Sequence, residues 1–446
     1  MTDFELGLES GDILGTEAGD SLAAELTLIE AGTLWDDLVA TWDDLVATWD
    51  SITPVTLPPT AGYPADADTS PSPFTYYVCN LFTGEILEEM PFSKFGYSRT
   101  KNKPGGWDAN IGQQQVKATD TLLSPWARSV YAARDNTLLY GGILQTRNTE
   151  SDEEMKIGGE GFFSYYQQGR RSLRSKVGML RAGGKNDFEI IYTQVDQFEI
   201  VMDFLRHAAS YSGGANVSYD IVRLHGPGVG GLSGVLRDRT YYTYELKEIG
   251  EAIEQMSEVI DGFDFSESYY WENNAIKRAF DLWFPWKGNL EPITMEVGNN
   301  VILLNRDEDG TAFATRAIAL GSGEADAQLQ AESVKAGIEY PTGPYPMLEH
   351  IETYSDVSIQ ATLQSHSQFD VNQASILKET LELEVTDRWE VELGAFDWGD
   401  AVIAYASDGA LQVSDIYRIE SFGVDIQGAG ISIKPTLVLY NASLGI

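Results

Sequence analysis

The chain has 446 residues, of which 43% are hydrophobic and 11% aromatic, so it is long enough for two or three domains with full-sized cores. Its formal net charge of -38 at pH 7 argues against a protein that wraps nucleic acid, because that task needs basic patches to displace counterions. The single cysteine, Cys79, excludes an intramolecular disulfide and a zinc cluster built from cysteines of one chain.

The first 33 residues form an acidic repeat with a period of eight. Leu6–Ile13 is echoed by Leu14–Ser21 and then by Leu22–Glu25, and no Lys or Arg occurs before Lys94. An even period keeps each Leu on one face of an extended chain, and each Gly-Asp pair is a turn signal. We therefore predict an arm of short hairpins over residues 1–33, with a disordered acidic segment as the alternative.

A second repeat, with a period of seven, covers residues 34–53. Trp35–Thr41 recurs without change as Trp42–Thr48, and a third copy begins at Trp49. This spacing predicts a helix with one narrow apolar face, too short to be stable alone in water. The face must pack on a partner, so we predict a docking stripe of six residues: Trp35, Leu38, Trp42, Leu45, Trp49 and Ile52.

Residues 54–74 are rich in Pro, Thr, Ala and Asp, which predicts an extended linker. The range 75–185 then carries alternating strand patterns separated by turns, which we interpret as a first barrel-like β domain. Its expected strands are 76–81, 85–90, 129–134, 138–144 and a segment around 155–157.

The range 186–375 is mixed, with apolar residues at helical spacing between strand patterns. Helices are expected at 195–209, 246–259 and 373–382, and strands at 218–224 and 240–244. A strand pair is expected from 300–305 and 315–320, joined by a turn at 307–310.

The last range, 376–446, again alternates at regular spacing, with strands expected at 388–393, 400–405, 414–419 and 432–439. The predicted fold is therefore a β-rich α+β protein, with two barrel-like β domains flanking a mixed α/β insert and an N-terminal repeat arm.

The sequence predicts no catalytic, cofactor-binding or metal-binding residue. Gly226–Gly231 matches G-x-G-x-x-G, but the residues after it lead into an aromatic strand and not into a helix, so a flexible loop is the better interpretation. The four histidines lie far apart, and Asp307–Asp309 lacks the spacing of a calcium loop and is interpreted as a turn. We expect no enzyme activity and no cofactor.

Two aromatic clusters, Trp283–Trp286 and Tyr269–Trp271, could stack on sugar rings, although such residues more often pack inside proteins. They motivate an alternative function, the binding or cleavage of carbohydrate. A third possibility is an acidic surface protein, but no secretion signal opens the sequence and no apolar stretch approaches the ~20 residues that cross a bilayer. We expect synthesis in the cytoplasm and no membrane insertion.

Short blocks in a fixed order resemble the minor tail proteins of long-tailed phages (siphoviruses), particularly the tail-tip or baseplate-hub type common in phages of actinobacteria. The blocks are Val78–Pro91, Ala132–Leu144 (with Tyr140 where Trp is usual), Ile260–Phe265, Leu282–Pro285, Val301–Leu320 and Asp397–Val402. They span about residues 75–440. Each block is short and degenerate, so their order carries the resemblance.

The resemblance implies a structural virion protein at the tail tip. The expected assembly is a homotrimer whose two barrel-like domains per chain make a six-fold-like ring around the DNA channel. Expected partners are the distal tail ring protein, the tape-measure protein and other tail-tip proteins, and genomic DNA is expected to pass through the lumen without specific binding. An acidic chain suits a lumen that repels phosphates, although a saline-adapted host would give the same composition.

Overall fold

A computed structural model describes residues 74–112, 119–149, 154–173, 189–210, 216–289, 293–355, 357–387, 391–409, 411–428 and 430–440. These residues all belong to one compact unit, Thr69–Ile446. The arm, the heptad helix and nearly all of the linker lie outside the described residues, so the expectations for them remain predictions.

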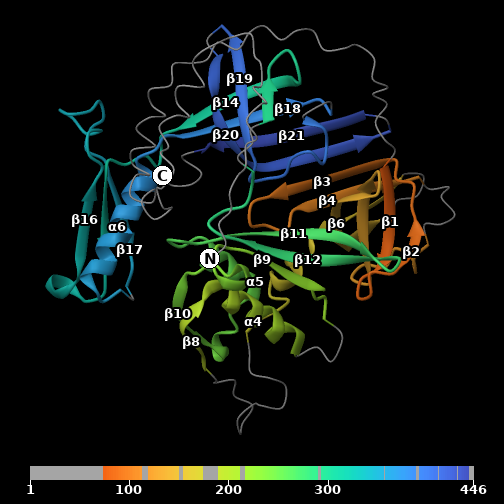
Figure 1. Cartoon of the computed structure of the whole chain (residues 1–446), viewed down its shortest axis with the longest axis horizontal. Helices are drawn as coiled ribbons and strands as arrows, with labels where there is room; N and C mark the ends of the chain where they lie inside the picture. Colours follow the sequence, from red (N-terminus) through yellow and green to blue (C-terminus); the bar gives the residue numbers. More distant parts are fainter. Residues whose placement is uncertain are drawn as a thin grey trace, which may run out of the picture. The chain divides into compact units, whose positions relative to one another are not determined.

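The β-rich character predicted from the sequence is confirmed, because one sheet of 13 strands dominates the described residues (Figure 1). Its first seven strands are β1 (Phe74–Asn80), β2 (Ile86–Glu89), β3 (Lys94–Thr100), β4 (Gly106–Ile111), β5 (Arg128–Arg134), β6 (Thr137–Asn148) and β7 (Met155–Glu160). The other six are β13 (Ile293–Glu296), β14 (Val301–Asp309), β18 (Lys378–Val385), β19 (Ala401–Asp408), β20 (Leu411–Gln427) and β21 (Gly430–Leu439). The hydrogen-bonded order is β14-β18-β21-β20-β3-β4-β7-β6-β5-β1-β2, with β19 on β20 and β13 on β19.

The long strand β20 joins the two β-rich ranges of the sequence. Its first half, Leu411–Arg418, pairs with β19, and its second half, Ser421–Gln427, pairs with β3. The two ranges therefore form one continuous sheet, where the sequence predicted two barrel-like domains. The described hydrogen bonds close neither range into a barrel: β13 and β14 follow each other through a short turn and meet only at the isolated bridge Val297–Val301.

One hydrophobic core runs along this sheet through both ranges. Phe95 and Tyr97 of β3 contribute to it together with Phe422 and Val424 of β20, and the rings of Tyr97 and Phe422 lie 6.4 Å apart. Alternate residues of each strand point to this side, as a period of two requires. Buried apolar side chains from distant parts of the sequence thus stabilise the joint sheet.

A second group of elements has its own core. It comprises β8 (Glu189–Asp196), α4 (Gln197–Ser210), β9 (Ile221–His225), β10 (Leu236–Tyr242), α5 (Ile249–Ser257), β11 (Asp264–Glu272) and β12 (Ala275–Trp283). The expected helices at 195–209 and 246–259 are confirmed as α4 and α5. Asp196 begins α4 by accepting a hydrogen bond from the main-chain nitrogen of Phe198 at 2.9 Å, which satisfies a free N–H group of the first turn.

Residues between β14 and β18 form a third group, with β15 (Arg316–Leu320), β16 (Gln330–Val334), β17 (Glu349–Thr353) and α6 (Gln360–Ala374). β15 pairs with β16 and β17 and not with β14, so the predicted strand pair is wrong. The predicted turn at 307–310 is also wrong, because β14 continues to Asp309 opposite Lys378 of β18. β14 has one strand neighbour, so its charged side chains can face water.

The predicted helix at 373–382 is wrong as well. α6 ends at Ala374, and β18 begins at Lys378 between β14 and β21. Glu379, Leu381, Leu383 and Val385 alternate as buried residues in this strand, so pairing on both sides overrides the local helix preference.

The other expected strands are confirmed, with one exception. Of the expected strand 388–393, residues 388–390 lie outside the described residues, and Val391 to Leu393 form no strand. There Asp387 accepts a hydrogen bond from the main-chain nitrogen of Leu393 at 2.6 Å. None of the helices in the described ranges has the length and hydropathy needed to cross a bilayer.

The packing of the joint sheet predicts that two isoleucines of β20 contribute differently to the free energy of unfolding. Ile419 is 0% exposed and Ile416 is 38% exposed. Ile419→Ala should lower the free energy of unfolding by about 2–5 kcal/mol, since it leaves a cavity in the shared core. Ile416→Ala should lower it by less than about 1 kcal/mol. Denaturant unfolding of both variants checks this, and equal losses would contradict the described packing of β20.

Candidate functional site

The predicted docking stripe (Trp35, Leu38, Trp42, Leu45, Trp49 and Ile52) lies outside the described residues. Gly226–Gly231 forms a loop with a short 3-10 turn, and the next element is the strand β10, so the helix that a dinucleotide-binding motif requires does not follow it. Within the described ranges, no group of three His, Cys, Asp or Glu side chains is arranged to hold a metal ion.

The aromatic clusters that suggested carbohydrate binding make contacts within the chain. The ring of Trp283 stacks on His225 with centroids 3.7 Å apart, and its indole nitrogen donates to Ser266 at 3.2 Å. Tyr269 donates to the carbonyl of Gly141 at 2.8 Å, and Trp271 donates to the carbonyl of Asn136 at 2.7 Å. Contacts within the chain therefore hold these three rings in place, although Trp271 is 38% exposed.

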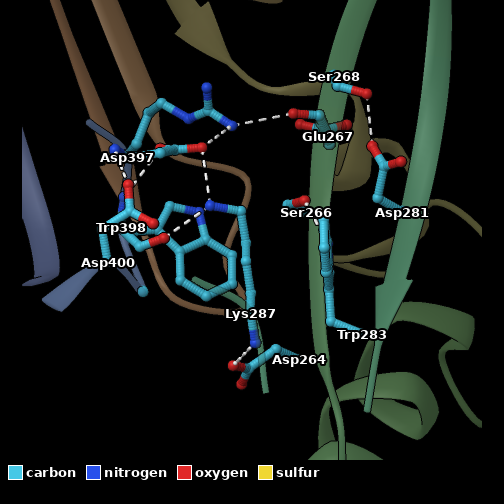
Figure 2. A network of polar contacts seen from close by, with 12 residues as sticks. Asp264, Ser266, Glu267, Ser268, Asp281, Trp283, Lys287, Asp397, Trp398 and Asp400 are labelled. Carbon is cyan, nitrogen blue, oxygen red and sulfur yellow. Dashed lines mark hydrogen bonds and ion pairs between the residues drawn. The ribbon is translucent and has the colours of Figure 1, made fainter. Parts of the chain in front are cut away.

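A network of polar side chains lies where β3, β11, the segment after β12 and the turn before β19 meet (Figure 2). We call it the polar junction and define it by six residues: Arg99, Asp264, Lys287, Asp397, Asp400 and Arg418. Three blocks of the sequence resemblance end at or beside it, namely Ile260–Phe265, Leu282–Pro285 and Asp397–Val402. Segments that are far apart in the sequence are thus held together by charged side chains.

Asp397 is the centre of one half of the junction. Lys287 donates from Nζ to Oδ2 of Asp397 at 2.9 Å and to the carbonyl of Trp398 at 2.6 Å (Figure 2). Nη2 of Arg99 lies 3.1 Å from the same Asp397 oxygen and donates to the carbonyl of Glu267 at 3.0 Å. Burial acts to raise the pKa of Asp397, but the charges of Arg99 and Lys287 outweigh it and hold the pKa below its usual range.

Asp264 is the centre of the other half. Its Oδ2 accepts hydrogen bonds from Nη2 of Arg418 at 2.5 Å and from the main-chain nitrogen of Lys287 at 2.8 Å. Arg418 is 1% exposed, and it also donates to the carbonyls of Gly399 and Lys287 at 3.1 and 2.8 Å. Such a desolvated cation is tolerated only where a carboxylate and carbonyls surround it.

Two glycines permit the backbones to approach this closely. Gly288 has φ +123°, and a Cβ added there would lie 1.9 Å from the carbonyl oxygen of Gly399. Gly399 has φ +96°, and its Cβ would lie 2.6 Å from the carbonyl oxygen of Lys287. Asp400 closes the turn by accepting hydrogen bonds from the main-chain nitrogens of Asp397 and Asn289, both at 2.8 Å. Any larger residue at either glycine would separate the two segments.

A further carboxyl, Glu267, lies beside the junction on β11 and is 9% exposed (Figure 2). Its Oε1 accepts hydrogen bonds from the main-chain nitrogen of Phe163 at 2.7 Å and from the Tyr219 hydroxyl at 2.6 Å. Burial outweighs these bonds and raises the pKa of Glu267 to about 7.

No protein-family model matches the sequence, and no curated protein matches it. Solved structures do match. The 43 kDa tail protein of prophage MuSo2 from Shewanella oneidensis aligns with a TM-score of 0.55 and 10% identity, over 82% of this chain and 99% of that chain. A tail protein from Neisseria meningitidis MC58 aligns with a TM-score of 0.51 and 10% identity, over 83% and 98%. The chain has the fold of these tail proteins.

The sequence resemblance to phage tail proteins is therefore confirmed for the fold. The polar junction itself was not predicted. One signal was present: Arg418 stands between the apolar residues Tyr417 and Ile419 in a chain that has 30 basic and 68 acidic residues. A rare cation inside a buried strand indicates a buried ion pair, but its partner Asp264 lies 154 positions away.

Breaking the buried pair should cost much more than breaking an exposed one. Arg418→Met should lower the free energy of unfolding by about 3–5 kcal/mol, because it removes the buried cation that donates to Asp264 and leaves this carboxylate only the more distant Lys101, 3.8 Å away. The matched control is Lys94→Met, which removes a half-exposed cation 3.5 Å from Asp108 and 3.4 Å from Asp425, and it should cost only about 0–1 kcal/mol. Denaturant unfolding checks both. If Arg418→Met combined with Asp264→Asn costs as much as the two single changes added together, the pair is not coupled.

Glu267 should make stability depend on pH. Its pKa rises from 4.5 to about 7 on folding, so its contribution to stability is fully present below pH 4.5 and is lost as the pH rises through 7. Relative to Glu267→Gln, the wild-type chain should lose on the order of 3 kcal/mol of unfolding free energy between these limits. Denaturant unfolding at pH 5 and pH 8 measures the difference, and parallel profiles for the two proteins would contradict it.

Proposed function

We propose that this chain is a structural component of a phage tail tip, a minor tail protein of the baseplate-hub type, with no catalytic role. One observation carries the proposal: the shared fold covers more than four fifths of this chain and nearly the full length of two tail proteins, one of them from a prophage. The proposed assembly is a homotrimeric ring in the virion that joins the tail tube to the host-contacting tip. Its proposed partners are the distal tail ring protein, the tape-measure protein and other tail-tip proteins.

The proposed ring uses the two β-rich ranges, 75–185 and 376–446, as hub domains, with the insert 186–375 between them. Three chains with two such domains each would give a ring of six similar units around the DNA channel. The continuous pairing of β20 with β19 and β3 supports this arrangement, since it holds the two β-rich ranges of one chain in a fixed register. Residues 54–74 are the proposed linker to the arm.

The net charge of -38 supports a lumen through which genomic DNA passes without specific binding. A wall of carboxylates repels phosphates and offers few of the Lys and Arg side chains that would release counterions. The proposed role of the N-terminal stripe, from Trp35 to Ile52, is attachment to another tail protein, because a short amphipathic helix needs a partner to be stable.

Light scattering and native mass spectrometry test the assembly. The full chain at micromolar concentration should have three times the 49.2 kDa chain mass, and a stable monomer would contradict the proposal. A variant that lacks residues 1–70 should keep the trimer, since the described residues form a compact unit from Thr69 onward. The same variant should bind tail partners less well than the full chain. Unfolding of the truncated chain would contradict the role proposed for the stripe.

A further inference from the structure

A cavity of about 20 Å³ lies beside the polar junction. A water molecule needs about 10–15 Å³, so this partly open cavity is large enough to hold an ordered water. The residues that surround it include Arg99, Lys103, Tyr140, Glu267, Tyr269 and Trp398. It is thus a mainly polar cavity, which favours hydration over an empty space.

Tyr140 supplies a free donor at this cavity. The side chain is 2% exposed, and its hydroxyl has no hydrogen-bond partner among the residues that the structure describes. The ring is held by stacking on Tyr97, with centroids 5.0 Å apart. A buried hydroxyl without a partner is costly, and a bound water is the usual remedy.

Glu267 supplies the acceptor. Phe163 and Tyr219 both donate to its Oε1, and none of the described groups donates to Oε2. A carboxyl group has about four acceptor positions, so it has capacity for another donor.

We propose that one ordered water molecule occupies this cavity, accepts the hydrogen bond of the Tyr140 hydroxyl and donates to Oε2 of Glu267. The water satisfies the free hydrogen-bonding positions of the Tyr140 hydroxyl and the Glu267 carboxyl. It also links β6 of the large sheet to β11. This inference goes beyond the proposed tail function and does not depend on it.

The charges at the site favour water over a small anion. Arg99 is paired with Asp397 at 3.1 Å, and Lys103 is paired with Glu254 at 2.9 Å. An ionised Glu267 would repel an anion. The charged and titratable groups near Glu267 are Arg99, Lys103, Tyr140, Tyr219, Tyr269 and Arg278.

A crystal structure that shows ordered water tests the proposal directly. The wild-type chain should have one density peak within hydrogen-bond distance of both Tyr140 and Glu267. Tyr140→Phe should lose this peak or displace it, while Tyr97→Phe, a neighbouring change in the same core, should keep it. An empty cavity in the wild-type structure would overturn the proposal, as would a peak that appears only in chloride buffers.

A pH titration gives an independent readout. Thermal unfolding of the wild-type chain over pH 4–9, compared with Glu267→Gln, reports the apparent pKa of Glu267. Tyr140→Phe should raise this pKa by about one unit, because ionised Glu267 loses a hydrogen-bond donor. Tyr97→Phe should leave it in place. Equal shifts in the two variants, or none in either, would overturn the role of the water.

Discussion

The structure depends on the desolvated ion pair between Arg418 and Asp264. Arg418 belongs to the large sheet and Asp264 begins the three-stranded sheet of β11, β12 and β9, so neither side can be buried correctly without the other. A buried pair adds little net stability compared with apolar residues, but a wrong arrangement leaves a charge without a partner. The pair therefore acts mainly on specificity: it selects the one arrangement in which β20, β11 and Lys287 meet.

The position of this pair on β20 has a physical reason. Arg418 pairs with Ala401 of β19, whereas Ser421 pairs with Thr100 of β3, so the strand changes neighbours between them. Main-chain groups at such a change lose ladder partners and need others. The main-chain nitrogen of Gly399 donates to the carbonyl of Ile419 at 2.7 Å. The main-chain nitrogen of Lys101 donates to the carbonyl of Glu420 at 3.0 Å. The turn that supplies Asp397 and Asp400 thus also completes the backbone of β20.

Local patterns predicted the strands well where one face is apolar, because alternation along a strand survives whichever strand becomes its neighbour. Local patterns failed where the neighbouring element, and not the local sequence, decides whether a segment becomes a helix, a strand or a turn. α6 buries Leu363, Ser367, Asp370 and Val371, a helical stripe that is half polar and gave no hydrophobic signal. The sequence predicts a turn at 307–310, where β14 in fact continues to Asp309, because these residues are acidic. Acidic residues suit a strand with one neighbour as well as they suit a turn.

The same limit explains why the junction was missed although its blocks were recognised. Two blocks, Ile260–Phe265 and Asp397–Val402, carry aspartates of the junction. The cations that pair with these aspartates lie outside the blocks and more than 100 residues away, as Lys287 does from Asp397. Spacing rules read neighbours along a helix or a strand, so they cannot pair such residues. In a chain with more than twice as many acidic as basic residues, the rare cation is the informative partner. Lys287 and Arg418 can be noticed in the sequence because cations are rare in it, whereas a single acidic residue cannot be distinguished from the many others.

The use of scarce cations inside the protein has a consequence for its surface. Arg99, Lys287 and Arg418 are buried or largely buried and are matched by Asp264 and Asp397. With Asp400, the six residues of the junction have no net formal charge, so the net charge of -38 is carried by the remaining residues. Self-repulsion among those charges opposes a compact state, and dissolved salt screens it. A fold of this charge therefore needs interior contacts that salt does not weaken, and the desolvated junction provides them. Repulsion between the exposed charges is screened by salt, whereas the buried pairs are not, so one chain can combine a rigid interior with a strongly anionic surface.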